Sequence, residues 1–582
     1  MGYYKNFELA TYFVAHGTEE TDRERLTKEI AFFEKHLHLD KVYLEPYRGG
    51  DFATEEQVRM CKEVFEAHGI RVAGGITTCA PQPEGTKRKA RMFDTLCYND
   101  KAMTDRLSSA AALCGRVFDE FIIDDFFFTN CTCEDCRKEK DAFNAEHGIT
   151  DGSWQGYRVA KLYQASKDFI IGPAKKENPN CRVIIKYPNW MESYQETGYD
   201  PASQKEIFDG IYTGTETRDA LHTDQHLPRY LSFSLMRYME AMLPGGNGGG
   251  WFDPYDCPLV EQYLEQAYLT AFSKPRELMM FCFQSLYDNL CIPTLGFMLD
   301  KLDALLTHLG DSTGTYCYIP NAAQGEDNIQ DFLGMHGFPI LPVPYFPENA
   351  KRVLLTASSA YDPDIVEKVE RFVAAGGKAI VTTGFVKATL DRGLKGMTSI
   401  RDGGRRIRTD RFFTAERWDG VRDLIAEKPL EFSVLELRNN ATWGALCKAV
   451  ADEESYSLLL RDTYGDGEMV TLNLPDAFGR IKYLPERILM LMRRELCPDI
   501  YLEGGPMVSL FTYDNDTFVL YPYNDRATHD QDIRVHIVGD VKLTDVESGR
   551  EIEPLYRERG ESVFAMRARV GKWQAYRIAR SE

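Results

Sequence analysis

The chain has 582 residues, of which 43% are hydrophobic, 27% charged and 12% aromatic. A single hydrophobic core stops growing at roughly 250 to 300 residues, so the length predicts two or three domains. The net charge of −20 disfavours nucleic acids and anionic membranes as partners, because their phosphates would be repelled. No basic and then apolar leader opens the sequence and no apolar run reaches membrane-spanning length, so we expect a cytoplasmic protein.

Short apolar runs alternate with amphipathic stretches through the first half of the chain, which is typical of a parallel α/β domain. Eight such runs start at Leu9, Lys41, Ile70, Glu120, Arg182, Phe208, Gly249 and Leu278. Eight strands with helical connections predict a (β/α)8 barrel over residues 1–305. The active site of such a barrel lies where the strands end, at their C-terminal side.

Polar residues follow the apolar part of nearly every run, and in a barrel they would converge on one rim. They are His16, Glu45, Arg48, Thr77, Asp124, Asp125, Lys186, Tyr187, Glu216, Arg218, Asp253 and Gln284. A purely structural set of loops would not need so many charged groups at this rim. For each residue taken alone, a solvated loop residue or a helix N-cap is an equally good interpretation.

The second half of the chain changes character. The stretch "RVLLTASSAYDPDIVEKVERFVAAGGKAIVTTGF" predicts strand, helix, glycine turn and strand, and a hairpin and a helix follow it. We therefore predict a second βαβ domain over residues 306–498. The last eighty or so residues alternate apolar and polar positions between Asn, Asp and Gly turns. This pattern predicts an antiparallel β-sandwich domain over residues 499–582.

The order of a barrel, a domain carrying "FVAAGGKAIVTTG" and "LNLPDAFG", and a small β-domain resembles the family 42 glycoside hydrolases, which are bacterial β-galactosidases. The resemblance implies that the middle domain is flavodoxin-like, similar to a class I glutamine amidotransferase without its chemistry. In that family this domain serves in subunit contacts. The resemblance therefore implies a homo-oligomer, with a trimer as the first expectation, and a glycoside or oligosaccharide substrate.

The stretch "FIIDDFFFTNCTCEDC" carries the most specific part of the resemblance. Family 42 enzymes have I-D-N-E here, followed by C-x-C-x2-C that binds zinc with an earlier cysteine. The matching cysteines in this chain are Cys131, Cys133 and Cys136, with Cys97 upstream. Four thiolates suit a tetrahedral zinc ion, which would be structural because no position is left for water. The alternative is that they are reduced core residues. We expect no organic cofactor.

The acid of that motif is not kept. Phe126 stands where the family has its acid/base glutamate, so the family mechanism cannot apply unchanged. Hydrolysis of a glycosidic bond still needs two carboxyl groups beside the anomeric carbon. The candidates at the predicted rim are Glu45, Asp124, Asp125, Glu216, Asp219 and Asp253.

A second resemblance helps to choose among them. The stretch "GGGWFDPYD" is similar to one in the α-galactosidases and α-N-acetylgalactosaminidases of clan D. The similarity implies a retaining enzyme with Asp125 as the nucleophile and Glu216 as the acid/base residue. Under the family 42 plan, Asp125 would instead be the acid and Asp253 the nucleophile.

The other polar and aromatic rim residues form the predicted substrate-binding set, with the two tryptophans as stacking platforms for a pyranose. The set is Asp124, Glu45, Arg48, Lys186, Tyr187, Trp190, Arg218, Trp251, Asp253 and Gln284. Two other functions remain open. The protein could be a carbohydrate-binding protein on an inactive scaffold, because of Phe126, or a lyase or epimerase that uses Lys186 and Tyr187.

Overall fold

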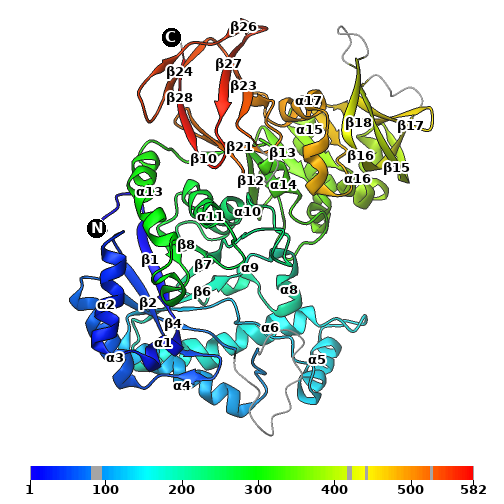
Figure 1. Cartoon of the computed structure of the whole chain (residues 1–582). Coiled ribbons are helices and arrows are strands. Elements are labelled where there is room, and N and C mark those ends of the chain that lie inside the picture. Colours follow the sequence, from blue (N-terminus) through cyan, green and yellow to red (C-terminus); the bar gives the residue numbers. More distant parts are fainter. Residues whose placement is uncertain (1, 80–94, 416–421, 439–443, 525–528, 581–582) are drawn as a thin grey trace. The chain divides into compact units, whose positions relative to one another are not determined.

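The computed structural model describes residues 2–79, 95–415, 422–438, 444–524 and 529–580. These residues form two compact units, drawn in Figure 1. The first contains the chain up to Gln225 and Met239–Thr307, and the second contains His226–Tyr238 and His308–Glu582. Among the described residues, no helix has the length and apolar character needed to cross a membrane.

The first unit is a closed barrel of eight parallel strands, as predicted. The strands are β1 (Glu8–Phe13), β2 (Lys41–Arg48), β4 (Arg71–Ile76), β5 (Glu120–Ile123), β6 (Arg182–Tyr187), β7 (Gly210–Gly214), β8 (Asn247–Phe252) and β9 (Glu277–Met280). Pairing of β1 with both β2 and β9 closes the barrel. A two-residue strand, β3 (Asp51–Phe52), pairs antiparallel with the end of β2. All eight apolar runs of the sequence are strands of this barrel.

Alternation along the strands sends every second side chain into the barrel, where the inward residues make one apolar cluster. Its members are Ala10, Tyr12, Tyr43, Ala73, Ile122, Ile184, Tyr212, Trp251 and Met279. The glycines of β8 make room for the larger residues. A Cβ atom on Gly249 would lie 2.6 Å from the Tyr212 hydroxyl oxygen, so a side chain there would collide with the cluster.

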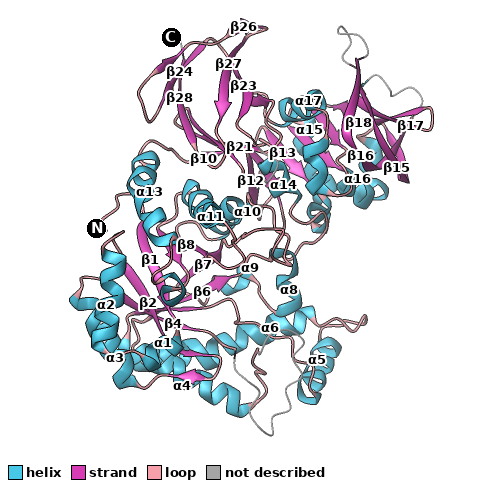
Figure 2. Cartoon of the chain, in the orientation of Figure 1, coloured by secondary structure: helices cyan, strands magenta, loops and turns pink. Residues whose placement is uncertain are grey.

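Helices cover the outside of the barrel strands, cyan around magenta in Figure 2. They are α1 (Ala15–Glu20), α2 (Arg23–Glu34), α3 (Glu55–Ala67), α4 (Lys101–Val117), α5 (Glu134–Glu146), α6 (Gln155–Ala165), α7 (Gly172–Glu177), α8 (Tyr194–Thr197), α9 (Pro201–Gln204), α11 (Val260–Phe272), α12 (Phe283–Leu286) and α13 (Cys291–Leu306). The first eight residues of α10 (Leu231–Met242) belong to the second unit. Local sequence sets several of the helix starts. For example, Thr54 and Gln57 form a reciprocal capping box at the start of α3.

The second unit contains the predicted flavodoxin-like domain. Its parallel strands are β11 (Thr315–Tyr318), β12 (Ile340–Val343), β13 (Arg352–Leu355), β14 (Lys378–Thr382) and β19 (Gly467–Leu472), in the order β12-β11-β13-β14-β19. The helices are α14 (Ile329–Met335), α15 (Ile365–Ala374), α16 (Thr383–Thr389) and α17 (Glu486–Leu496). The sheet continues through β18 (Glu454–Tyr464), which forms the predicted hairpin with β19. Three further antiparallel strands were not expected from the sequence: β17 (Ala445–Ala451), β15 (Ile400–Thr414) and β16 (Arg422–Leu437).

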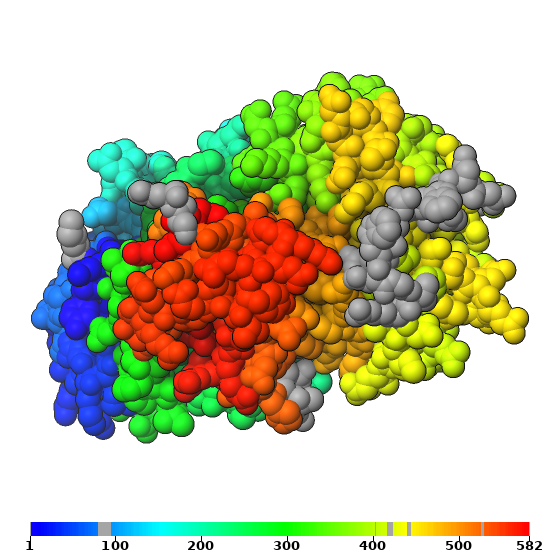
Figure 3. All heavy atoms as spheres, turned by 90° about the horizontal axis from the view of Figure 1, so that it is seen from above, coloured from blue at the N-terminus to red at the C-terminus, as the bar shows by residue number. Residues whose placement is uncertain are grey.

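Two antiparallel sheets share the C-terminal core, which confirms the predicted β-domain class. One sheet contains β10 (Ser312–Thr313), β21 (Val508–Tyr513), β22 (Thr517–Pro522), β28 (Gln574–Arg580), β24 (Val541–Asp545) and β25 (Glu551–Ile552). The other contains β20 (Ile500–Glu503), β23 (Gln531–Val538), β27 (Glu561–Ala568) and β26 (Tyr556–Glu558). The strands from β20 to β28 belong to the red and orange surface in Figure 3. β10 belongs to the first of these sheets, although its residues lie outside the range 499–582 that was predicted for the C-terminal domain. One strand of this domain therefore comes from an earlier part of the chain.

A buried ion cluster lies at the N-terminal end of the barrel. Lys41, the first residue of β2, donates from Nζ to Glu120 at 2.6 Å, to Glu277 at 2.7 Å and to the Tyr43 hydroxyl at 2.7 Å. The ammonium group also lies 4.3 Å from the centre of the Tyr43 ring. The three strands that carry these residues are thereby tied together far from the C-terminal rim.

We predict that Lys41→Met lowers the free energy of unfolding by about 3 kcal/mol, because it leaves the buried Glu277 without its cation, whereas Glu120 keeps its ion pair with Arg182. Chemical denaturation followed by tryptophan fluorescence measures this change. Replacement of the exposed Lys101, whose partner Asp105 is also exposed, should change stability by less than about 1 kcal/mol. Equal effects of the two substitutions would contradict the importance of the buried cluster.

Candidate active site

Asp124 and Asp125 directly follow β5, the fourth barrel strand. Arg48 donates to Asp124 Oδ2 at 2.7 Å, and the Asp125 amide donates to Asp124 Oδ1 at 2.7 Å. Both oxygens of the buried Asp124 are therefore bound within the protein. The side chain of Asp125 is 16% exposed, and its Oδ2 accepts from Lys186 Nζ at 2.7 Å. Of the two neighbouring acids, Asp125 is the one available to a substrate.

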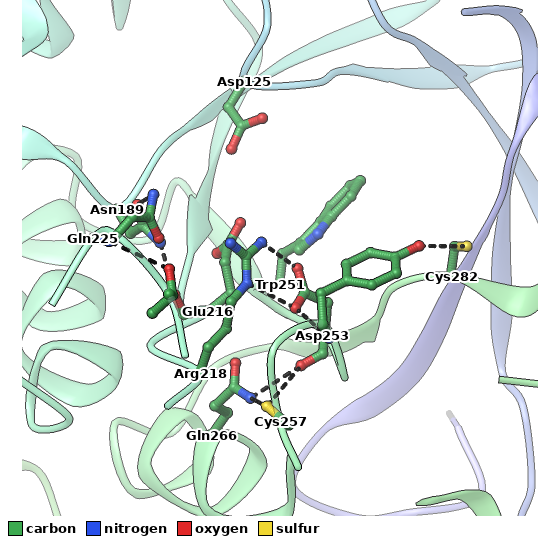
Figure 4. A network of polar contacts seen from close by, with 12 residues as sticks. Asp125, Asn189, Glu216, Arg218, Gln225, Trp251, Asp253, Cys257, Gln266 and Cys282 are labelled. Atoms are coloured by element: carbon green, nitrogen blue, oxygen red, sulfur yellow. Dashed lines mark hydrogen bonds and ion pairs between the residues drawn. The ribbon is translucent and has the colours of Figure 1, made fainter. Parts of the chain in front are cut away.

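Glu216 follows β7, the sixth barrel strand, and faces the same space as Asp125 (Figure 4). Its Oε1 accepts from Lys186 Nζ at 3.2 Å. Its Oε2 is buried and has no hydrogen-bond partner among the described residues. Asn189 donates to the Glu216 carbonyl at 2.7 Å, and Gln225 donates to Asn189 Oδ1 at 3.4 Å. This chain of amides fixes the loop that carries Glu216.

Glu45 and Arg48, both in β2, form the wall beside Asp124. The buried Glu45 carboxylate accepts four hydrogen bonds, at 2.5 to 2.9 Å. The donors are the Tyr12 hydroxyl, the Ala15 amide, Thr77 Oγ1 and Arg48 Nε. Burial raises the pKa of Glu45, although the charge of Arg48 opposes it. Because its acceptor capacity is used inside the protein, Glu45 supports the site and is poorly placed for direct chemistry.

Asp253, which follows β8, is held by Arg218 in a two-pronged ion pair. Arg218 Nε donates to Oδ1 at 3.0 Å and its terminal nitrogen donates to Oδ2 at 2.6 Å, drawn as dashed lines in Figure 4. The Tyr255 amide adds a third donor to Oδ1 at 3.1 Å. Both carboxylate oxygens are thus occupied, which gives Asp253 the geometry of a structural anchor between the loops after β7 and β8.

The two predicted stacking tryptophans lie in different environments. Trp251 is 2% exposed and stacks on Phe281, with ring centres 4.7 Å apart. Its indole therefore belongs to the barrel core, contrary to the predicted role as a sugar platform. Trp190 is partly exposed and packs edge-on against Phe128 and Tyr194. Tyr255, two residues after Asp253, is an aromatic residue beside the carboxylates, and 42% of its surface is exposed.

Two predicted binding residues lie away from the carboxylate cluster. The side chain of Tyr187 is buried outside the barrel, where its hydroxyl donates to Gln204 at 3.0 Å. Strand alternation explains this, because Lys186 points inward and its neighbour must point outward. Gln284 brackets the turn after β1, accepting from the Val14 amide at 3.3 Å and donating to the Val14 carbonyl at 3.4 Å. Neither placement fits the predicted sugar contact.

The electrostatics of the site follow from its burial and crowding. Burial alone would raise the pKa of Asp124, but the charges of Lys186 and Arg48 outweigh it and hold that pKa well below its usual range. Burial also raises the pKa of Asp125 to about 8, because repulsion from Asp124 and Glu216 adds to it against the attraction of Lys186. The two adjacent acids therefore titrate far apart, which is typical of residues with different roles.

The four predicted metal ligands are brought together as the sequence led us to expect. Cys97, Cys131, Cys133 and Cys136 are buried, and their sulfur atoms all lie within 4.8 Å of one another. Cys97 Sγ is 3.9 Å from Cys133 Sγ and 3.6 Å from Cys136 Sγ. Tetrahedral zinc with Zn–S bonds of ~2.3 Å requires sulfur atoms ~3.8 Å apart. The spacing and the soft donor set therefore fit a zinc ion.

A hollow of about 930 Å³ lies at the other end of the barrel strands, lined by Lys41, Arg71, Arg182 and Glu277 among others. None of the polar residues that follow the strands borders it. The candidate site is therefore defined by the converging carboxylates and not by this hollow. Sequence reasoning missed three residues of the candidate site, Asn189, Tyr255 and Tyr199, whose hydroxyl donates to the Asp125 carbonyl at 2.7 Å. Only Asn189 had a signal, its position two residues after the fifth barrel strand.

Comparison with known proteins gives matches along most of the chain. The family model "Probable glycosyl hydrolase, catalytic domain" matches residues 1–294, and "Probable glycosyl hydrolase, C-terminal domain" matches residues 499–579. A model of the second domain of the uncharacterized protein SSO3021 matches residues 310–417. That protein, from Saccharolobus solfataricus, is 27% identical over 426 residues, which cover 65% of this chain and 67% of the relative.

Among solved structures, the chain is similar to a β-galactosidase from Bacillus circulans sp. alkalophilus, with a TM-score of 0.65, 13% identity and 99% of each chain covered. It is also similar to the α-L-fucosidase isoenzyme 2 from Paenibacillus thiaminolyticus, with a TM-score of 0.64 and 12% identity, over 99% of this chain and 100% of that one. Identities this low show a common fold. They do not carry over a substrate.

Proposed function

Because this chain belongs to the glycosyl hydrolase family whose catalytic-domain model matches its first 294 residues, we propose that it is a retaining glycosidase that removes a terminal sugar. The observation that carries the proposal is the pair of carboxylates, Asp125 and Glu216, that face each other across Lys186 Nζ. Two carboxyl groups on either side of the anomeric carbon are what glycoside hydrolysis requires.

Asp125 is the proposed nucleophile. Lys186 holds its Oδ2, while the partly exposed side chain leaves the other oxygen available to attack the anomeric carbon. The attack forms a covalent glycosyl-enzyme and expels the leaving group. A nucleophile held by one oxygen is preorganised for this attack.

Glu216 is the proposed acid and then base. Its buried Oε2 lacks a hydrogen-bond partner among the described residues, so the carboxyl group must turn toward the leaving oxygen of a bound glycoside before it can donate to that oxygen. Glu216 donates a proton to that oxygen in the first step. In the second step it takes a proton from the water that attacks the glycosyl-enzyme.

The separation of the two acids supports retention of configuration. Both facing oxygens lie within hydrogen-bonding distance of one nitrogen, at 2.7 and 3.2 Å. The two bound oxygens, Asp125 Oδ2 and Glu216 Oε1, can therefore be no more than about 6 Å apart, a limit that is compatible with the ~5–5.5 Å between the carboxyl groups of retaining enzymes. The alternative nucleophile, Asp253, has both oxygens bound by Arg218.

The charges of the site favour an uncharged sugar as substrate. The three cations beside the carboxylates, Arg48, Lys186 and Arg218, are each paired with protein carboxylates. A uronic acid or sulfated sugar would enter among acidic groups with none of these cations free to bind it. We therefore propose a neutral glycoside, such as a galactoside or a related hexoside.

The rival functions have less support. Lys186 and Tyr187 point to opposite faces of β6, so they cannot act together as base and acid of a lyase or epimerase. The carbohydrate-binding alternative rests on Phe126, yet Asp125 and Glu216 supply a carboxylate pair without the missing glutamate.

We also propose structural zinc at the four cysteines and a homotrimer, and the cytoplasmic location remains a prediction.

Substitution of the two acids tests their roles. Asp125→Gly should abolish turnover, and azide should partly restore it by giving a glycosyl azide of inverted configuration. Glu216→Ala should lose natural substrates but keep activated aryl glycosides, whose leaving groups need little protonation. The control is Asp219→Asn, since Asp219 binds within its own loop to Leu221 and His222. An active Asp125→Gly enzyme without azide would refute the assignment.

The pH dependence separates nucleophile from acid. With its pKa raised to about 8, Asp125 loses its proton only as the pH rises through that value. If it must be ionised to attack, kcat/KM for an activated aryl glycoside should rise about tenfold from about pH 7 to about pH 9. A flat profile with this substrate, and a fall with an unactivated one, would instead make Asp125 the proton donor.

Elemental analysis of the purified protein should find about one zinc per chain. Cys133→Ser should remove the metal and lower the melting temperature more than it lowers the turnover of the folded fraction, because the binding energy of a structural metal is folding energy. Cys61→Ser is the matched control, as Cys61 is buried outside the cluster. Zinc-free protein of full stability would exclude the metal.

A further inference from the structure

Lys186 occupies the centre of the candidate site, and its side chain is not accessible to a sugar. Its side chain is 2% exposed, and Nζ donates to Asp125 at 2.7 Å, Glu216 at 3.2 Å and Asp124 at 3.5 Å. An ammonium group has three protons to donate. All three therefore have acceptors within the protein, so a sugar hydroxyl would have to displace one of them.

The barrel topology dictates this arrangement. β6 lies between β5 and β7 in the sheet, and Lys186 pairs with Tyr212 of β7. Lys186 is thus the inward residue near the end of the middle strand, with the acids after β5 on one side and Glu216 on the other. A lysine at this position is the cation nearest to both catalytic carboxylates.

An aromatic face closes the remaining side of the ammonium group. Nζ lies 4.0 Å from the centre of a Trp251 ring, at a distance that gives a cation–π interaction. Trp251 is itself held by Phe281 and Tyr12, with ring centres 4.7 and 4.8 Å away. Since these rings fill the barrel core, Lys186 can neither withdraw nor swing without breaking packed contacts.

The charges around Lys186 show why its position matters. The acidic groups that face it or its partners are Asp124, Asp125, Glu216, Asp253 and Glu45, and the other cations are Arg48 and Arg218. Arg48 serves Glu45 and Asp124, whereas Arg218 serves Asp253. Lys186 is therefore the one cation of this set that contacts both Asp125 and Glu216.

We propose that Lys186 is a positioning residue, which holds the nucleophile and the acid/base group at a fixed separation and supplies the positive charge between them. This inference rests on the proposed glycosidase function and replaces the sugar-binding role predicted from the sequence. Without the ammonium group, Asp125 and Glu216 repel each other across a buried space. The sugar should still bind, since its hydroxyls do not depend on Lys186.

The test compares Lys186→Met with Lys41→Met. Both lysines are buried in the barrel, contact two or more carboxylates and lie over an aromatic ring, but they occupy opposite ends of the strands. Both substitutions should lower the melting temperature. Only Lys186→Met should lower kcat for an activated aryl glycoside, by about 100-fold, as expected when reacting groups are misplaced. Its KM should change less than about threefold, because uniform binding is kept.

The pH profile gives a readout that a merely structural role would not move. Loss of the cation should shift the rising limb of kcat/KM upward by about one pH unit or more in Lys186→Met, and not at all in Lys41→Met. Lys186→Arg should show a smaller shift than Lys186→Met, because arginine keeps the positive charge but not the geometry of the lysine. An unshifted profile in Lys186→Met, or a raised KM at unchanged kcat, would overturn the proposal.

A titration that needs no turnover separates this inference from the glycosidase proposal. Protein labelled with 13C at the aspartate carboxyl carbons can be followed by NMR, with Asp125 assigned from its missing signal in Asp125→Asn. Asp125 should titrate about one pH unit or more higher in Lys186→Met than in the parent protein. Equal titration of Asp125 in Lys186→Met and in the parent protein would refute the positioning role of Lys186 even if the enzyme is active. A shift of this titration without turnover of any glycoside would refute only the glycosidase function.

Discussion

The contact of one buried ammonium group with three carboxylates organises the C-terminal end of this barrel. Buried charges are costly unless they are paired and hydrogen-bonded. Lys186 and the acids after β5 and β7 meet this condition only together. The strand ends are thus fixed relative to one another by the same groups that the proposed chemistry uses. Stability and the proposed reactivity depend on the same cluster, in which the charges of Lys186 and Arg48 hold the pKa of Asp124 down and burial raises the pKa of Asp125.

The loop after β5 combines two functions in a short stretch of chain. Its first residues, Asp124 and Asp125, face the barrel interior, and its later residues supply Cys131 and Cys133 to the thiol cluster, which Cys136 in the first turn of α5 and Cys97 complete. A metal there would tie this loop to the segment before α4. The proposed nucleophile, Asp125, would then be preorganised from both sides, by Lys186 within the barrel and by the thiol cluster at the far end of its loop.

Phe126 stands where family 42 enzymes have their acid/base glutamate, so the proposed chemistry uses other carboxylates on the same type of fold. The fold is shared with a β-galactosidase and an α-L-fucosidase at 13% and 12% identity. Those two proteins act on different sugars and on different anomers, so the barrel fold itself dictates neither the sugar nor the anomeric configuration. The roles must come from the local carboxylates. The proposed pair is Asp125 and Glu216, whereas Arg218 binds both oxygens of Asp253.

The sequence by itself determined the eight barrel strands, the βαβ and β-domain classes and the run of Cys131, Cys133 and Cys136, because strand periodicity and cysteine spacing are local properties of the chain. The resemblance to family 42 implied the flavodoxin-like class and added Cys97 to the cysteine cluster. The sequence also identified Asp125 and Glu216 as rim residues. Only the tertiary structure decided which rim residues meet. Trp251 and Tyr187 are buried on opposite sides of the barrel wall, and Lys186 binds acids rather than sugar. The partners of a side chain depend on strand order and on which face it takes, and residues far apart in sequence supply both.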